Sequence, residues 1–272
     1  MSARDPETAG SGAQSVERAL ALLSLVGRGG EAGRGLAELV SDTGLSRPTA
    51  RRLLVALAGA GLIEQDGETR RYHLGPEAFL LGSLAASRHG VVTHAADSLR
   101  RLAKATGDTA FISVPQGDHI LCLAREDGDF PIRTHALQKG DCNPLGAGAG
   151  GLAVLAAMPK AQADAVLARL GDALAQRMGP SAERLAADVD LARDRGYAVN
   201  PGRVVPGSWG LGVAVLWPDG TPAAALSLAA IEARLGPDRQ PRLIALLQDE
   251  ARLIEAALAG KPAVRRSAVH AR

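Results

Sequence analysis

The sequence predicts an α+β fold, in which an N-terminal winged helix-turn-helix is joined by a linker helix to a larger domain that mixes helices with antiparallel strands. Three observations predict this fold. Apolar residues recur at helical spacing between residues 15 and 57, a turn at Asp66-Gly67 separates two short extended runs, and alternating patterns begin at residue 109. The length of 272 residues fits two domains.

The first domain is expected over residues 15–75, after a disordered leader of small and polar residues, 1–14. Its expected elements are a helix opened by Ser15 and stopped by Gly29-Gly30, a helix over 36–42 ended by Gly44, a helix over 46–57 and a hairpin over 62–74. The short helix, the turn with glycine and the following helix form a helix-turn-helix, and the hairpin forms its wing.

The helix over 46–57 has the residues that a DNA-reading helix needs. Short polar and cationic side chains lie at its start, apolar side chains lie behind them, and residues 43–61 contain no Asp or Glu. Arginine can bind guanine or phosphate with two hydrogen bonds, and a helix N-terminus favours phosphate. We therefore expect DNA contacts from Ser46, Arg47, Thr49, Arg51 and Arg52, and from Arg70 and Arg71 in the wing. For any one arginine alone, an ordinary solvated helix face is the alternative.

A linker helix is expected over residues 76–95, either packed in a core or paired between subunits. The second domain is expected over 96–260. Its predicted elements are a helix near Leu99, strands over 109–114 and 120–124, helices over 146–158, 161–170 and 181–195, strands over 197–200, 211–217 and 223–228, and a helix over 238–258. A basic tail, 261–272, follows.

Composition excludes several classes of protein. Aromatic residues make up 3% of the chain, which argues against binding single-stranded nucleic acid by ring stacking. Two cysteines are too few for a disulfide scaffold or a zinc finger. The net charge of +2 conceals a local feature, because residues 15–80 hold eight Arg and eight acids while the basic residues gather in the recognition helix and wing.

The N-terminus lacks the apolar stretch of a signal peptide, and no run approaches the roughly 18 apolar residues of a membrane helix. We expect a cytoplasmic protein with no membrane partner.

The segments SVERALALL, GLSRPTARRLL and GLIEQDGETRRYHLG resemble the N-terminal winged helix of the IclR family of bacterial transcriptional regulators. The segments LRRLAKATGDTAFISV, PLGAGAGGLAVLAAMP and RDRGYAV, with the final helix, resemble that family's C-terminal domain. The resemblance covers about residues 15–260. It implies a GAF-like α/β effector-binding domain, and a homodimer or dimer of dimers on a palindromic double-stranded operator.

The same resemblance places a small-molecule effector site around a glycine-rich loop, a following strand and two later strands. Free amides at a helix start suit a carboxylate, so we expect an organic acid. Tight helix–sheet packing is the other explanation for the glycines. The implied effector-binding residues are Leu145, Gly146, Ala147, Gly148, Gly150, Gly151, Asn200, Gly210, Leu211 and Ser227.

The chain departs from the family pattern in this region. Gly146, Gly148 and Leu152 stand where His, Ser or Thr, and Lys are common, and Ala229 replaces a second polar residue. The resulting pocket is expected to be apolar. Arg203 follows Asn200 in place of an acidic stretch, and is expected either on the surface or against an anionic effector.

Enzyme signatures fail on their context. Gly146-x-Gly148-x-x-Gly151 matches a dinucleotide fingerprint, but no buried strand is expected before it. Pro206 stands where a G-x-S-x-G elbow needs its first glycine. The histidines lack metal-ligand spacing, and Cys142 is expected to be an unreactive thiol. We therefore expect a ligand-responsive DNA-binding regulator that is not an enzyme and has no metal or cofactor. A metabolic enzyme and a protein-interaction adaptor are the alternatives.

Overall fold

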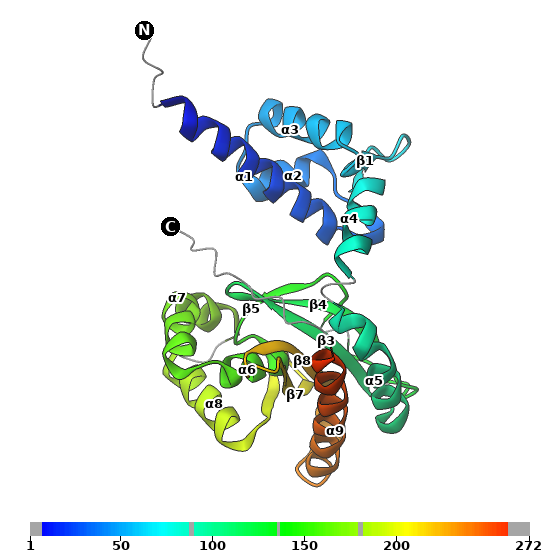
Figure 1. The fold of residues 1–272 in the computed structure, drawn as a ribbon, viewed down its shortest axis with the longest axis vertical. Coiled ribbons are helices and arrows are strands. Elements are labelled where there is room, and N and C mark those ends of the chain that lie inside the picture. Colours follow the sequence, from blue (N-terminus) through cyan, green and yellow to red (C-terminus); the bar gives the residue numbers. More distant parts are fainter. Residues whose placement is uncertain (1–6, 87–89, 135–136, 179–181, 261–272) are drawn as a thin grey trace. The chain divides into compact units, whose positions relative to one another are not determined.

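The computed structural model describes residues 7–86, 90–134, 137–178 and 182–260. The chain divides into two compact units, Met1–His89 and Gly90–Arg272 (Figure 1). Each unit has its own hydrophobic core, so each is considered separately.

The first unit is a helix-turn-helix followed by a two-stranded wing. Its elements are α1 (Glu7–Arg28), a short 3-10 helix (Gly30–Ala32), α2 (Leu36–Thr43), α3 (Arg47–Gly59), β1 (Ile63–Gln65), β2 (Tyr72–Leu74) and α4 (Pro76–Ala86). The buried core joins α1, α2, α3 and the wing through Leu22, Leu39, Leu54, Ile63 and Tyr72. A backbone bridge between Arg34 and Tyr72 ties the wing to the chain before α2. The expected order of elements is confirmed.

Two expected boundaries are wrong. Helix α1 begins at Glu7, so residues 7–14 are helical and Ser15 is not an N-cap. No proline interrupts this stretch, and the helix continues outward from its packed half. The linker helix is shorter than the expected 76–95, because α4 ends at Ala86 and residues 91–95 belong to α5. Residues 1–6 and 261–272 lie outside the described residues.

The second unit is a six-stranded antiparallel sheet with helices on both faces. Its elements are α5 (Val91–Thr106), β3 (Thr109–Gln116), β4 (His119–Glu126), β5 (Cys142–Pro144), α6 (Gly148–Ala157), α7 (Lys160–Met178), α8 (Ala182–Arg195), β6 (Ala198–Val205), β7 (Ser208–Leu216), β8 (Pro222–Ile231), a 3-10 helix (Glu232–Arg234) and α9 (Gln240–Ala259). The strand order is β5-β4-β3-β8-β7-β6. The helix-turn-helix unit and this α/β unit together form the predicted α+β fold.

The strand period of two divides the sheet into a packed face and a functional face. Residues 110 and 112 of β3, 211 and 213 of β7, and 224, 226 and 228 of β8 pack against α5 and α9. Ala225 instead joins a second core with α6, α7 and α8, on the opposite face (Figure 1). The strands therefore hold α6 over the middle of the sheet, beside β6 and β7.

One buried carboxylate fastens the ends of α5 and α9 together. The Asp108 side chain is 1% exposed, and its two oxygens accept from Arg234 Nε and Arg239 Nη1, each at 2.6 Å. Arg234 also donates to Thr106 O at 2.8 Å and stacks 3.7 Å over the Phe130 ring. Both oxygens of the Asp108 carboxylate are thus paired with arginines that follow β8, the last strand, in the chain.

We expect Asp108→Ala to destabilise the second unit by about 3–5 kcal/mol, because it leaves two partly buried arginines without their buried partner. Urea unfolding followed by the fluorescence of Trp209 and Trp217 reports on this unit, since it holds both tryptophans. Asp249→Ala is the matched control. Its exposed pair with Arg252 should contribute less than about 1 kcal/mol. Equal effects of the two substitutions would contradict the assignment.

Candidate functional site

The turn before α3 is fixed by glycine geometry and a side-chain cap. Gly44 ends α2 with a φ of 64°, in the left-handed region, and donates to Val40 O at 3.0 Å. Ser46, the first residue of the predicted helix, is the N-cap of α3, because its Oγ accepts the Thr49 amide at 3.4 Å. The Ser46 and Thr49 hydroxyls also lie 2.9 Å apart. These contacts set where the first turn of α3 begins.

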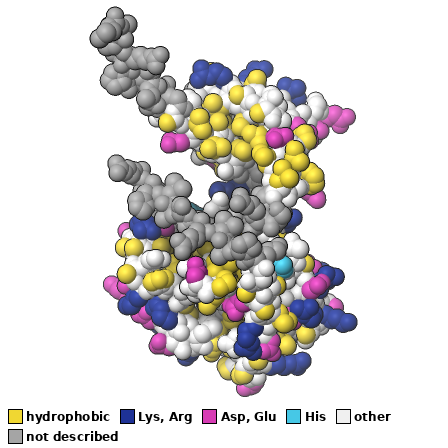
Figure 2. All heavy atoms as spheres, in the orientation of Figure 1, with side chains coloured by type: hydrophobic (Ala, Val, Ile, Leu, Met, Phe, Trp, Pro, Cys, Tyr) yellow, Lys and Arg dark blue, Asp and Glu magenta, His cyan; other side chains and the backbone are white. Residues whose placement is uncertain are grey.

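Burial on one side of α3 leaves the predicted DNA face exposed. Ala50, Leu54 and Leu57 are buried, whereas Ser46, Arg47, Arg51 and Arg52 are exposed and Thr49 is half-buried. The three arginines form no ion pair within 4.0 Å with any described carboxylate. Figure 2 shows basic side chains gathered over α3. The helix therefore offers several unpaired cations beside its own N-terminus.

Val55 is an exposed residue on this face that the sequence prediction missed. It lies one turn after Arg51 and is 64% exposed. An exposed valine beside arginines can contact a thymine methyl group. Its apolar type concealed it, because apolar residues in an amphipathic helix are expected to face the core.

The wing tip is a capped turn that presents Arg70. Asp66 accepts from the Thr69 hydroxyl at 2.7 Å and the Thr69 amide at 2.6 Å, and these bonds lower the pKa of Asp66. Arg70 has a φ of 58°, a strained conformation for a residue other than glycine, and its side chain is exposed. The turn thus holds a cation at the tip of the wing.

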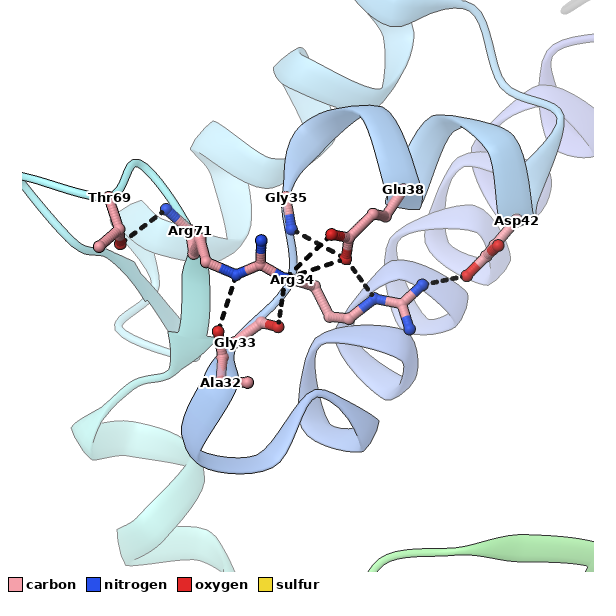
Figure 3. Close-up of polar contacts among 8 residues, drawn as sticks. All are labelled: Ala32, Gly33, Arg34, Gly35, Glu38, Asp42, Thr69 and Arg71. Carbon is pink, nitrogen blue, oxygen red and sulfur yellow. Dashed lines mark hydrogen bonds and ion pairs between the residues drawn. The ribbon is translucent and has the colours of Figure 1, made fainter.

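Arg71 is half-buried and turns back onto the unit, where it joins the wing to the start of α2. Its Nε donates to Ala32 O at 2.7 Å, and its Nη2 donates to Gly33 O at 3.1 Å and Glu38 Oε1 at 2.9 Å (Figure 3). The hydrogen bond from Arg71, followed by one from the Gly35 amide, lowers the pKa of Glu38. Two nitrogens of this guanidinium are thus bound within the protein, and the predicted DNA contact of Arg71 stays a prediction.

Arg34 completes the same network from the other side of Glu38. Its Nε lies 3.2 Å from Glu38 Oε2, and its Nη2 pairs with Asp42. Glu38 therefore binds two arginines and also caps the Gly35 amide (Figure 3). The sequence shows a Glu three residues after Gly35, but gives no sign that Arg71 reaches it.

A pocket opens on the second unit between the first turn of α6 and strands β3, β6, β7 and β8. It has about 620 Å³ of space, including its open mouth. The predicted effector residues that line it are Ala147, Gly148, Gly150, Gly151, Asn200, Gly210 and Ser227. Lining residues that the prediction did not include are Phe111, Ser113, Ile120, Leu137, Asn143, Ala149, Val204, Ser208, Trp209, Leu228 and Ala229.

Three predicted effector residues lie outside the pocket. Leu145 is fully buried in the core beneath α6 and α7. Gly146 turns toward Leu174 and Leu155. Leu211 packs against α5 and α9, because its neighbour Gly210 takes the pocket face of β7 and strand residues alternate. The same alternation could have identified Phe111 and Ser113.

Glycine brings the start of α6 against the sheet. A Cβ atom at Gly212 would lie 2.7 Å from Ala149 O, so only glycine allows this approach. Ala147 is the N-cap and makes no side-chain cap, which leaves the first-turn amides of α6 facing the pocket region. The Ser227 hydroxyl lies 3.8 Å from the Cβ position of Gly150, in that turn. Close packing and a binding surface therefore share the same glycines.

The enzyme signatures do not gain support from the fold. The segment before the glycine loop does form a strand, β5, but it is a short antiparallel edge strand instead of a buried parallel one. Ser208 begins an antiparallel strand and is not at a strand-to-helix elbow. Burial raises the pKa of the Cys122 thiol to about 11. Cys142 is half-buried in β5.

Within the described residues, no group of three or more His, Cys, Asp or Glu could hold a metal ion. In the same part of the chain, no helix has the length and apolar character to cross a membrane.

Known proteins resemble the chain in both units. The profile of the IclR helix-turn-helix domain matches residues 15–67, and that of the bacterial transcriptional regulator IclR C-terminal domain matches residues 83–256. The HTH-type transcriptional repressor AllR of Klebsiella pneumoniae is 29% identical over 259 residues, which cover 94% of this chain and 93% of AllR.

Solved structures show the same fold. The IclR transcriptional regulator from Alicyclobacillus acidocaldarius superposes with a TM-score of 0.76 at 25% identity, over 90% of this chain and 98% of that one. An IclR homolog complexed with 4-hydroxybenzoate, from Microbacterium hydrocarbonoxydans, superposes with a TM-score of 0.72 at 22% identity, over 91% and 100% of the two chains.

The two wing arginines should respond differently to substitution. Arg70→Gly should weaken DNA binding without destabilising the fold, because glycine relaxes a conformation that costs about 1 kcal/mol. The slope of log affinity against log salt should fall by about 0.9 for each phosphate that the wing no longer neutralises. Fluorescence anisotropy with operator DNA across a salt series measures this slope.

Arg71→Met is the matched comparison. It should weaken DNA binding and lower the melting temperature while leaving the salt slope unchanged, since Arg71 neutralises Glu38 and not a phosphate. An equal decrease of the slope in both variants would contradict the separation of roles.

Proposed function

Because the chain belongs to the IclR family of bacterial transcriptional regulators, with a helix-turn-helix domain and an effector-binding domain, we propose which of its residues perform the two functions. Helix α3 enters the major groove and reads bases and phosphates with Ser46, Arg47, Thr49, Arg51 and Arg52. The pocket beside α6 binds an organic acid, and this binding changes operator affinity.

The exposed N-terminal half of α3 is the observation that carries the DNA proposal. It combines a capped helix start with three arginines that are exposed and not paired with any described carboxylate. Those arginines can bind base edges and phosphates. Arg70 adds a contact from the wing tip, and Arg71 holds the wing in place through its bond to Glu38.

The pocket chemistry favours a carboxylate ligand. The first-turn amides of α6 bear partial positive charge, and the nearby Ser227 is only 8% exposed. Among the described residues its hydroxyl has no hydrogen-bond partner, so a ligand oxygen would satisfy it. The relative bound to 4-hydroxybenzoate supports an organic acid as the ligand class.

Helix α4 supports a homodimer, or a dimer of dimers. Phe79 is 78% exposed, and Leu80 and Leu81 are each half exposed. A helix that is apolar around most of its surface is normally covered. A second copy of this helix would cover these side chains and place two recognition helices on a palindromic operator.

Two other functions remain as alternatives to test. An enzyme would need an acid, base or thiol in the pocket, and the described lining residues offer hydroxyls and amides only. An adaptor without DNA binding would give no gel shift on the promoter next to its own gene, even at low salt. We propose that the protein acts in the cytoplasm as a repressor, like the named relative AllR.

Substitutions in the two units should separate the two binding functions. Arg51→Ala should weaken operator binding by about 1–3 kcal/mol while ligand-induced thermal stabilisation persists. Ser227→Val should abolish that stabilisation while operator affinity persists. Anisotropy and thermal-shift assays measure the two effects. Substituting Leu145 would test folding instead, because this residue is fully buried. Unchanged operator affinity in Arg51→Ala would exclude α3 as the reading helix.

The oligomer should depend on α4. Phe79→Glu with Leu80→Glu should raise the dimer dissociation constant at least about tenfold, because each large apolar side chain contributes roughly 1.5–3 kcal/mol when buried. Sedimentation velocity should then show the 28.0 kDa chain mass at concentrations where the unsubstituted protein is twice as heavy. Leu253→Glu, on exposed α9 surface, is the control. A dimer that survives both substitutions places the interface elsewhere.

A further inference from the structure

Among the described residues, the wall of the α6 pocket contains no charged side chain. Its described polar side chains are Ser113, Asn143, Asn200, Ser208 and Ser227, and its other lining residues are apolar or glycine. Positive charge for an anion is then supplied by the N-terminus of α6, which amounts to about half an elementary charge. Ser208 is 5% exposed, and its hydroxyl, which is neutral, has no hydrogen-bond partner among the described residues. This wall suits one carboxylate and an uncharged body.

Arg203 lies between two pocket-lining residues in the sequence, but its side chain points away from the pocket. Its neighbours Asn200 and Val204 both line the pocket, in the part of β6 where pairing with β7 is irregular. The Arg203 amide donates to Asn200 Oδ1 at 3.2 Å, which holds the backbone against the pocket. The guanidinium instead turns to α8, where its Nη1 pairs with Asp188.

The pair between Arg203 and Asp188 is well shielded from water. The two side chains are 17% and 14% exposed, so their attraction is screened less than that of a surface pair. Asp188 also lies 3.5 Å from Arg184 Nε, on the outer side of α8. Moving Arg203 into the pocket would break its ion pair with a largely buried carboxylate, which is unfavourable. The cation at the pocket is therefore already neutralised.

We propose that Asp188 holds Arg203 away from the pocket and so limits the effector to a single negative charge. This proposal rests on the proposed effector site. The second carboxylate of a dianion would lose its water without gaining a counter-ion. Asp188 is thus a positioning residue that acts on selectivity through Arg203. Without Asp188, Arg203 is free to bind a second carboxylate.

Two probes of equal shape test the proposal. Terephthalate and its monoamide, 4-carbamoylbenzoate, have the same ring and length but differ by one negative charge, and Phe111 and Trp209 in the wall suit an aromatic ring. Isothermal titration with the full chain measures both. The monoamide should bind at least about tenfold more tightly than terephthalate, the difference expected when one buried charge lacks a partner.

Variants then test the role of Asp188. Asp188→Asn keeps the side-chain shape but removes the charge, and should raise terephthalate affinity at least about tenfold while monoamide affinity changes less than about twofold. Arg203→Met is the matched control. It removes the cation altogether, so terephthalate should still be excluded. Melting temperatures without ligand establish that each variant is folded.

Several outcomes would overturn the proposal. They are equal binding of both probes to the unsubstituted protein, binding of neither probe, and unchanged discrimination in a folded Asp188→Asn variant. If that variant does not fold, Asp188→Ser removes the same charge and should raise terephthalate affinity in the same way, and unchanged discrimination in a folded Asp188→Ser variant would equally overturn the proposal. If the monoamide binds selectively but leaves operator affinity unchanged, the charge limit stands and the proposed regulatory role of the pocket fails.

Discussion

Ion pairing between arginines and carboxylates determines which cations of this protein are available for binding. The chain has nearly equal numbers of basic and acidic residues, and carboxylates hold arginines at structural joints in both units. Glu38 fixes Arg71 and thereby the wing, Asp108 fixes the ends of α5 and α9, and Asp188 takes up the charge of Arg203. The arginines on α3 have no such partner among the described carboxylates. These arginines, with Arg70 at the wing tip, are therefore available for the proposed DNA contacts.

This pairing explains how a unit with balanced charge can bind DNA. Long-range attraction to DNA scales with net charge, whereas a specific contact needs cations in the right place. Ser46 and Gly44 set that place, because they define where α3 begins and leave its buried face with Leu54 in the core. A subunit of this kind should bind non-specific DNA weakly. In the proposed dimer, two recognition helices engage two half-sites together, which raises operator affinity, and the apolar surface of α4 is the proposed contact between the subunits.

Local sequence signals predicted the order of elements and the start of α3 near Ser46, because helical spacing, glycine stops and strand alternation act over a few residues. They could not predict Arg71 bound to Glu38 or Arg203 bound to Asp188, since these pairs join segments far apart in the chain. The prediction of the pocket was correct in part. Family resemblance indicated the correct loop and strands, but Leu145 and Leu211 face a core on account of their backbone positions. Strict alternation along β7 would have excluded Leu211 from sequence alone.

In the proposed regulator, ligand binding at the α6 pocket and operator binding at α3 are linked in one molecule. The direct measurement is a complete thermodynamic cycle: operator affinity with and without a saturating pocket ligand, and ligand affinity with and without operator. The two ratios must agree, and a coupling of about 5- to 150-fold is typical of allosteric proteins. We predict equal ratios that differ clearly from one. A ligand that binds the pocket tightly while both ratios equal one would contradict the account.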